Sequence, residues 1–409
     1  MNILLIGPYP PPYGGISSLI RSLVDGFKRK KVNKVVILYF GNKNRIRNVD
    51  GAIVYEKSVL KNSWQILNPL NWALLPLLIK IYSGQNLSFR DYLNIFIRTI
   101  LTINLSKKHN INTTNFYQSD TSLHLLLCKE LWGKNISIIL TVFGEIYDHY
   151  EYLISKKKIF LEMLNKSDAV ISSSCYCAES FKIVGNDRQI KVIYVGVSAS
   201  RFSNIEVLRG SYRKNLGIKA SATVLLFMGR FSREMGLHGI LEMFPSLLKS
   251  QVDFHLILAG ASGELVDAAT ECKDNYPDKI TVMNNISFDL QPSLYAAADL
   301  LLAPSRDKHA CMGVSIKEAM AAGIPVIASD SGGIPEAIIH NETGVIVPLQ
   351  EDGENNLKEF EQAIITLSLD EKKRKKFALD ALKRAKDIFS EEETIERTLK
   401  VFKKHAPSQ

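Results

Sequence analysis

The sequence DLLLAPSRDKHACMGVSIKEAMAAGIPVIASDSGGIPEAIIHNETGVIV, residues 299–347, alternates short apolar runs with a helical pattern and turn residues. Continuous apolar runs predict buried strands at residues 300–303 and 325–328, with a helix of residues 313–322 between them. Glycines mark the end of this helix and the turn before the next one, because glycine adopts backbone conformations that other residues avoid. This strand–helix–strand order is typical of a parallel sheet covered by helices.

The same alternation runs through both halves of the chain. Its 409 residues, 46% of them hydrophobic, are enough for two domains with separate cores. We therefore predict an α/β fold of two Rossmann-like, doubly wound domains that face each other across a cleft. Ligands are expected at the carboxyl ends of the strands.

Glu318 is an unusual residue within the predicted helix, because its neighbours Ile316, Ala319 and Met320 are apolar. A buried carboxylate needs hydrogen-bond partners, since removing it from water is costly. The hydroxyl groups of a ligand are one candidate partner. A capping or salt-bridge role within the protein is the other interpretation.

The sequence shows no sign of secretion or of a membrane span. The first residues, MNILLIGPYPPPYGG, include no basic region, and their apolar run ends at Gly7 and Pro8. This pattern predicts a strand and a loop rather than a signal peptide. No run reaches the roughly 18 apolar residues that a membrane-spanning helix needs. The five cysteines have no metal-type spacing, and we expect reduced thiols in a cytoplasmic protein.

Two segments of the first half suggest contact with a charged or apolar surface. Residues 26–49 carry eight basic side chains and no acidic one, within a net charge of +9. Nucleic acid, an anionic membrane and a solvated face are the alternatives, and the absence of a nucleic-acid motif favours the membrane. Residues 64–105 combine apolar side chains, tryptophans and basic flanks, as in helices that lie in a membrane interface. Core helices would also explain most of this segment.

Two loops of the first half carry candidate site residues. Gly14 and Gly15 lie between a strand and a helix, where amides of the helix N-terminus attract phosphate. Tight packing is the plainer explanation for these glycines. Glu145 follows a predicted strand of residues 136–142, and it is either a polar group of the site or a cap of the next helix.

The segment PSRDKHACMGVSIKEAMAAGIPVIASDSGGIPE, residues 304–336, resembles the signature of the retaining, family-four glycosyltransferases of the GT-B fold. That signature contains a proline-serine turn, a first glutamate, an FG-like pair, a second glutamate, G-x-P-V and a closing G-G-x-P-E. Glu318 matches the second glutamate, and Met312 with Gly313 matches the FG-like pair. The resemblance covers nearly the whole chain and is strongest over residues 222–348.

The resemblance implies that a nucleotide-sugar donor binds the second domain. Arg230 matches the arginine that grips the donor diphosphate, and Arg230 and Glu145 are the catalytic candidates. Glu318 would accept hydrogen bonds from the ribose hydroxyls. The other donor-binding candidates are Gly14, Gly15, Met312, Gly313 and Val314, and Asn285 and Ile286 would lie at the nucleobase.

Three polar positions of the family are changed in this chain. Ala310 stands in place of the first glutamate, Met235 in place of the lysine that accompanies the arginine, and Phe143 in place of the usual histidine. Candidates to replace the missing cation are Lys308, His309 and Lys317.

Together these features predict a retaining hexosyltransferase that moves a sugar to a lipid-linked or membrane-bound saccharide, as in polysaccharide, O-antigen, lipopolysaccharide or glycolipid assembly. We expect residues 1–199 to bind the acceptor, residues 200–385 the donor, and residues 386–409 to form a helix crossing back to the first domain. We expect no bound metal ion, because the sequence contains no Asp-x-Asp motif. We also expect no nucleic-acid partner. The protein would lie at the inner face of the cell membrane. The alternative is a non-catalytic GT-B subunit that binds a nucleotide or a partner enzyme.

Overall fold

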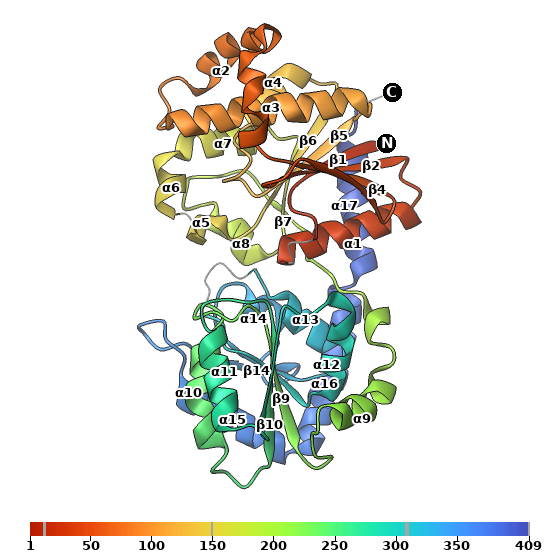
Figure 1. The fold of residues 1–409 in the computed structure, drawn as a ribbon, viewed down its shortest axis with the longest axis vertical. Helices are drawn as coiled ribbons and strands as arrows, with labels where there is room; N and C mark the ends of the chain where they lie inside the picture. The colour runs from red at the N-terminus through yellow and green to blue at the C-terminus, as the bar shows by residue number, and fades with distance from the viewer. Residues whose placement is uncertain (11–13, 149, 307–310, 408–409) are drawn as a thin grey trace. The chain divides into compact units, whose positions relative to one another are not determined.

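The computed structural model describes residues 1–10, 14–148, 150–306 and 311–407. The chain divides into two compact units, which are described separately (Figure 1). Unit 1 consists of Met1–Tyr194 and Glu392–Gln409, and unit 2 of Val195–Glu391. Ala310, together with Lys308 and His309, lies outside the described residues.

Unit 1 is built on a sheet of eight strands in the order β3-β4-β2-β1-β5-β6-β7-β8. All neighbouring strands are parallel except β3 and β4, which form an antiparallel pair at one edge. The central strands are buried on both faces, as expected for a parallel sheet covered by helices. The strands are β1 (Asn2–Ile6), β2 (Lys34–Phe40), β3 (Arg45–Val49), β4 (Ala52–Lys57), β5 (Thr113–Tyr117), β6 (Ser137–Val142), β7 (Ala169–Ser172) and β8 (Lys191–Val192).

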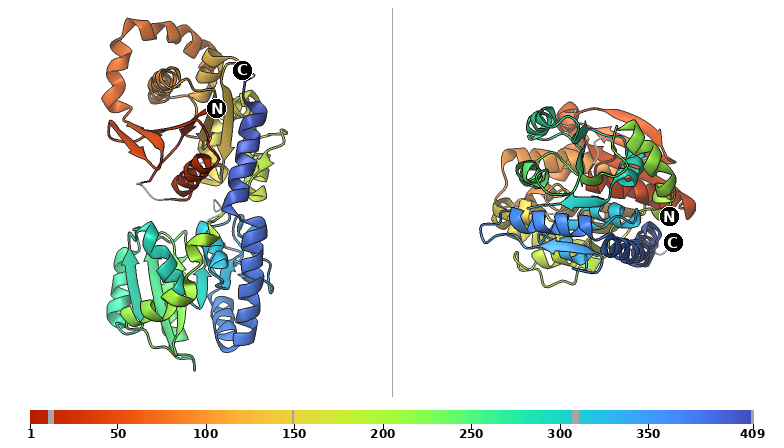
Figure 2. Two further views of the ribbon diagram at one scale, coloured as in Figure 1. Left: turned by 90° about the vertical axis from the view of Figure 1, so that its right-hand side faces the viewer. Right: turned by 90° about the horizontal axis from the view of Figure 1, so that it is seen from below.

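The helices of unit 1 include one segment that stands apart from the others. In Figure 2 (left), η1, η2 and α2, in orange, arch around the outside of α3, which is seen end-on. The helical elements are α1 (Gly15–Arg29), η1 (Leu60–Leu67), η2 (Pro69–Leu74), α2 (Leu75–Tyr82), α3 (Phe89–Lys108), α4 (Leu125–Trp132), α5 (Glu145–Asp148), α6 (Tyr150–Ser155), α7 (Lys157–Lys166), α8 (Cys175–Ser180) and α17 (Glu391–His405).

The last helix, α17, packs against α1 within unit 1. A Cβ atom at Gly26 would lie 2.2 Å from Cδ1 of Ile395, so the close approach of the two helices requires glycine there. Lys30 extends this contact with ion pairs to Glu392 (2.5 Å) and Glu396 (2.6 Å). Part of the basic segment of residues 26–49 is therefore neutralised by acidic residues from the far end of the chain.

Unit 2 contains a second, fully parallel sheet in the order β11-β10-β9-β12-β13-β14. Its strands are β9 (Thr223–Met228), β10 (Phe254–Gly260), β11 (Ile280–Asn284), β12 (Leu300–Ala303), β13 (Val326–Ser329) and β14 (Gly344–Val347). The helices are η3 (Ala199–Phe202), α9 (Ile205–Asn215), α10 (Leu237–Leu247), α11 (Val266–Asn275), η4 (Phe288–Leu290), α12 (Gln291–Ala297), α13 (Val314–Ala321), α14 (Ile334–Ala337), α15 (Leu357–Leu369) and α16 (Glu371–Ile388). The predicted α/β fold with two Rossmann-like sheets is confirmed.

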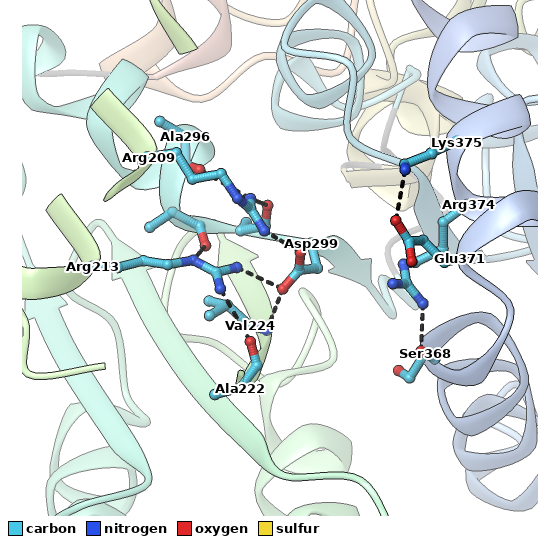
Figure 3. Close-up of polar contacts among 12 residues, drawn as sticks. Arg209, Arg213, Ala222, Val224, Ala296, Asp299, Ser368, Glu371, Arg374 and Lys375 are labelled. Atoms are coloured by element: carbon cyan, nitrogen blue, oxygen red, sulfur yellow. Dashed lines mark hydrogen bonds and ion pairs between the residues drawn. The ribbon is translucent and has the colours of Figure 1, made fainter. Parts of the chain in front are cut away.

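Charged side chains tie α9 to the amino ends of the strands in unit 2 (Figure 3). Asp299 precedes β12 and accepts hydrogen bonds from the side chains of Arg209 and Arg213. The same carboxylate accepts the backbone N–H of Val224 at 2.7 Å. Because ligands of such sheets bind at the carboxyl ends of the strands, we assign this cluster to structure rather than to the site.

Candidate active site

The loops at the carboxyl ends of β9 and β10 lie against each other in unit 2. A Cβ atom at Gly260 would lie 1.8 Å from the carbonyl oxygen of Gly229, so this approach requires glycine. Arg230 follows Gly229, is exposed, and its guanidinium makes no hydrogen bond or ion pair with the described part of the chain. Its charge is therefore available to an anionic ligand.

The loops that follow β12 and β13 also lie in contact at this edge of the sheet. A Cβ atom at Gly333 would lie 1.6 Å from the carbonyl oxygen of Cys311, so the Gly-Gly turn packs directly on the segment before α13. Met312 is buried, Gly313 has a positive φ of 68° at the start of α13, and Val314 is half-buried. Arg230 and these three residues thus follow neighbouring strands, β9 and β12, at the same edge.

Glu318 lies on α13 and is 5% exposed. Its carboxylate accepts hydrogen bonds from Nη1 of Arg201 (2.9 Å) and from the hydroxyl of Tyr295 (2.9 Å). Burial raises the pKa of Glu318, while the Arg201 charge acts in the opposite direction. Within the protein, Glu318 thus forms a salt bridge with Arg201, one of the two roles expected for it from the sequence. Each carboxylate oxygen still has a second lone pair, so a role toward ribose stays a prediction.

Arg201 is a site residue that the sequence did not reveal. Its guanidinium also donates to the carbonyl of Phe288 (3.1 Å) and to Oε1 of Gln291 (2.9 Å), and it stacks 3.5 Å from the ring centroid of Phe288. Arg201 and Glu318 are 117 positions apart, and neither local periodicity nor the family motif links them. The buried position of Glu318 indicated that a partner was needed but not which one.

Neither Met235 nor Lys317 supplies a free cation in place of the family's lysine. Met235 packs against the apolar core of unit 2 and supplies no charge. Lys317 is buried and donates to the carbonyl of Val195 at 2.6 Å. Burial lowers the pKa of Lys317 to about 8. Its ammonium is therefore committed to a backbone contact rather than free to replace the missing cation.

The residues predicted at the nucleobase lie at the end of β11, the edge strand of the unit 2 sheet. The side chain of Asn285 accepts the backbone N–H of Ser262 (3.1 Å) and donates to its hydroxyl (2.8 Å). Asn285 has a positive φ of 53°, and its N–H donates to the carbonyl of Gly260. Asn285 therefore joins two loops at this edge, and Ile286, half-buried, follows it.

Gly14 and Gly15 lie in unit 1, at the start of α1, and both are exposed. Among the described residues, the N-cap position is Gly14, which has no side chain to cap the helix. A Cβ atom at Gly15 would meet nothing within 4 Å, so packing does not require glycine at this position. The two glycines follow β1 at the carboxyl edge of the unit 1 sheet.

Glu145 is buried at the carboxyl edge of the same sheet, with 1% exposure. One carboxylate oxygen accepts the backbone N–H and the hydroxyl of Ser119, both at 2.9 Å, and the other accepts the N–H of Phe143 at 2.5 Å. Burial and the nearby Asp120 raise the pKa of Glu145 from 4.5 to about 7, although the backbone hydrogen bonds act to lower it. Glu145 thus joins the loop after β5 to the loop after β6.

The raised pKa of Glu145 predicts a pH-dependent stability. The carboxyl group of Glu145 has a higher pKa in the folded protein than in the unfolded chain. It therefore stabilises the folded state at a pH below its pKa in the unfolded chain, and this contribution is lost as the pH rises through about 7. Wild type should therefore lose about 2 kcal/mol relative to Glu145→Gln between about pH 5 and pH 8. Thermal unfolding of both proteins at the two pH values tests this. Glu130→Gln, an exposed change on α4, is the control, and a pH-independent difference between wild type and Glu145→Gln would contradict the prediction.

Comparisons with known proteins agree with this architecture. The family described as Glycosyl transferases group 1 matches residues 209–384. A GDP-mannose-dependent alpha-(1-6)-phosphatidylinositol monomannoside mannosyltransferase from Mycobacterium tuberculosis is 29% identical over 352 residues, 84% of each chain. The putative glycosyltransferase YtcC of Bacillus subtilis is 25% identical over 272 residues, 63% of this chain and 65% of YtcC.

A solved structure shows the same fold over the full length. Anabaena Alr3699/HepE in complex with UDP-glucose has a TM-score of 0.71 and 17% identity, covering 98% of this chain and 99% of that one. The fold and the family match define a glycosyltransferase of the GT-B class. Residues 209–384 are thus similar to the glycosyl transferases group 1 family, and sugar transfer is the general activity that the comparisons support.

Proposed function

We propose that this glycosyltransferase moves a sugar, with retention of configuration and without a metal ion, from a nucleotide sugar to a lipid-linked or membrane-bound saccharide. Arg230 would stabilise the departing diphosphate, and Glu318 would hold the ribose. The exposed, unpaired guanidinium of Arg230 at the carboxyl edge of the sheet supports the first role. The absence of Asp-x-Asp from the sequence supports metal independence.

The observation that carries the membrane part of the proposal is an apolar surface on η1, η2, α2 and the start of α3. We call it the 60–89 surface. Its residues are 39–84% exposed, and so many exposed large apolar residues in one short segment are unusual for a soluble protein. They are Leu60, Trp64, Leu67, Leu70, Trp72, Leu75, Ile79 and Phe89.

The charges around this surface suit an anionic bilayer. Residues 57–90 contain no aspartate or glutamate, and the basic side chains among them are Lys57, Lys61, Lys80 and Arg90. A helical segment with exposed Trp and Leu and with basic neighbours is typical of proteins that lie in a membrane interface. No helix within the described ranges is long and apolar enough to span a membrane.

Burial and ion pairs leave little of α3 and only part of the basic segment available for the proposed membrane contact. Most of α3 is core, because Ile95, Phe96, Ile97, Ile100 and Leu101 are buried. The basic segment of residues 26–49 is partly paired, since Arg45 binds Glu56 and Lys30 binds residues of α17. The 60–89 surface is therefore the better candidate for the membrane contact, and the protein would act at the inner face of the cell membrane.

A vesicle-binding experiment tests this proposal. Wild type should co-sediment with vesicles of phosphatidylcholine and phosphatidylglycerol, and added salt should weaken binding, because each basic contact contributes about 1 kcal/mol. The double variant Leu67→Gln/Leu70→Gln should bind at least about tenfold more weakly, since burying each leucine contributes about 1.5–3 kcal/mol.

The matched control is Val207→Gln/Leu379→Gln, which replaces two exposed apolar residues of unit 2. It should bind like wild type. If wild type does not bind these vesicles, if salt has no effect, or if the two double variants bind equally, the 60–89 surface is not a membrane contact.

A further inference from the structure

Unit 1 contains a polar cavity beside the 60–89 surface, and its lining has unsatisfied hydrogen-bonding groups. We infer that this cavity binds the saccharide part of the acceptor, an inference that rests on the proposed function. The cavity consists of two adjoining hollows, an inner one of about 150 Å³ and a more open, outer one of about 610 Å³. The two parts share Asp91, Asn94 and Tyr152. The outer volume is within the range of about 300–1,000 Å³ that is usual for small-molecule sites.

Three elements of unit 1 build the inner part. Helix α3 contributes Asp91, Asn94 and Arg98, the loop between β5 and α4 contributes Asp120 and His124, and α6 contributes Tyr152. Because the loop follows β5, the inner cavity lies near the carboxyl edge of the sheet, where ligands of parallel sheets bind. Ser119, the residue before Asp120, donates two hydrogen bonds to Glu145, so the cavity and Glu145 are close together.

His124 is the strongest indication of a ligand. The residue is 1% exposed, and neither ring nitrogen has a hydrogen-bond partner among the described residues. Its ring packs edge-on against Phe40 and Phe116, with centroid distances of 5.5 and 5.2 Å. Burial and the Arg98 charge lower the pKa of His124 well below its ordinary value, so the ring is neutral and offers one donor and one acceptor. Buried polar groups are normally paired, and a ligand would supply the missing partners.

Arg98 provides a second unsatisfied group in the same cavity. Its Nη1 donates to the carbonyl of Thr121 at 2.6 Å, and its guanidinium lies 4.8 Å from the ring centroid of Phe40. Its buried Nε has no hydrogen-bond partner in the described part of the chain. Two different side chains therefore have unused hydrogen-bonding capacity in one cavity.

The mixture of charges favours a ligand rich in uncharged hydroxyl groups. Arg98 and Lys156 can donate. The carboxylates of Asp120 and of Asp91, whose Oδ2 already accepts hydrogen bonds from Ser88, would repel a phosphate. A hydroxyl group both donates and accepts, so a saccharide can use all of these groups and the neutral His124 as well. Tyr152 adds an aromatic face, although Lys156 lies 4.0 Å from its ring centroid.

The outer part of the cavity opens beside the apolar surface. Asn86, Leu87, Ser88 and Arg90 line it, and they flank Phe89, which is 84% exposed and belongs to the 60–89 surface. An acceptor with a sugar and a lipid chain likewise has a polar part next to an apolar part. Its saccharide would occupy the cavity while its apolar chain contacts the 60–89 surface.

The test uses defined probes in place of the natural acceptor. Methyl and octyl glycosides of glucose, galactose, mannose and N-acetylglucosamine are titrated into full-length protein, with binding followed by saturation-transfer NMR and calorimetry. At least one octyl glycoside should bind wild type, and more tightly than its methyl counterpart because of its apolar chain. Inorganic phosphate should not compete.

His124→Phe separates a ligand contact from a structural one. Phenylalanine keeps the edge-on packing but removes both nitrogens, so the thermal midpoint should stay or rise while glycoside affinity falls at least about tenfold, as expected for a lost hydrogen bond. Asn94→Ala should also weaken binding. Asn48→Ala, an exposed asparagine of β3 that lines neither part of the cavity, is the control and should bind normally.

Specific outcomes would overturn the inference without affecting the proposed donor chemistry. Absence of glycoside binding to wild type, unchanged affinity in His124→Phe and Asn94→Ala, or competition by phosphate would each contradict a saccharide site. Nucleotide binding to unit 2, measured in the same samples, reports separately on the proposed function. If UDP, GDP and ADP all fail to bind, the proposed function fails, whatever the glycosides do.

Discussion

Glu318→Ala is expected to weaken nucleotide binding by at least about 30-fold and to lower the unfolding free energy of unit 2 by about 3 kcal/mol. The stability loss arises because Arg201, 19% exposed at its side chain, would lose its carboxylate partner. Removing one member of a buried ion pair costs about 3–5 kcal/mol, and the partial exposure of Arg201 places the loss at the lower end. The binding loss would come from the proposed hydrogen bonds between the carboxylate and ribose, where a charged partner contributes about 1.5–3 kcal/mol.

Glu318→Gln separates these two effects. The amide can still accept from Arg201 and donate to the Tyr295 oxygen, so unit 2 should lose less than about 1 kcal/mol. Nucleotide affinity should nevertheless fall by about tenfold, because the charge is gone. Calorimetry with UDP, GDP and ADP and thermal unfolding measure both quantities. If the nucleotide that binds wild type binds both variants with equal affinity, Glu318 has only the structural role shown by its contacts with Arg201 and Tyr295.

The strands of the parallel sheets were predictable because apolar runs and turn residues are local features of the sequence. The predicted strand of residues 300–303 coincides with β12, and that of residues 325–328 differs by one position from β13. The helix between them begins and ends within one residue of α13, since glycines mark both ends. Apolar runs and turn residues were sufficient for these elements, and the family motif added the identity of the fold.

Partners far apart in the sequence could not be predicted in the same way. The pattern around Glu318 showed that it needed a partner, but Arg201 comes from a segment 117 positions earlier. Glu145 is held by Ser119, 26 positions away, and Lys30 is paired with Glu396, 366 positions away. Such contacts depend on how the elements pack, which a single sequence does not encode locally.

The segment of residues 64–105 shows the limit of amphipathic patterns. The same apolar spacing predicted either core helices or a membrane-facing segment, and the structure contains both. Ile97 of α3 is fully buried, whereas Leu70 of η2 is 84% exposed. Periodicity shows that a helix has an apolar face, but it does not show what covers that face.

Arg230→Ala is expected to reduce the kcat of sugar transfer by at least about 100-fold, which corresponds to about 3 kcal/mol of lost transition-state stabilisation. In the proposed reaction, charge develops on the diphosphate as the donor bond breaks, and Met235 supplies no cation at the position where the resemblance places a lysine. Arg230 would therefore carry more of this stabilisation than it does in relatives with both charges. Arg233→Ala is the comparison, because Arg233 is an exposed arginine of the same loop. It should change kcat less than about threefold, a small fraction of the loss expected for Arg230→Ala.

The most direct measurement is donor consumption by the purified protein. UDP-, GDP- and ADP-sugars are supplied one at a time with a membrane extract as acceptor source, and release of the nucleoside diphosphate is followed for wild type and Arg230→Ala. We predict that wild type consumes at least one donor and transfers its sugar to an extract component, and that Arg230→Ala is nearly inactive. If wild type consumes no donor, or if Arg230→Ala is as active as wild type, sugar transfer through Arg230 is contradicted. A non-catalytic subunit that binds a nucleotide or a partner enzyme would then be the better description.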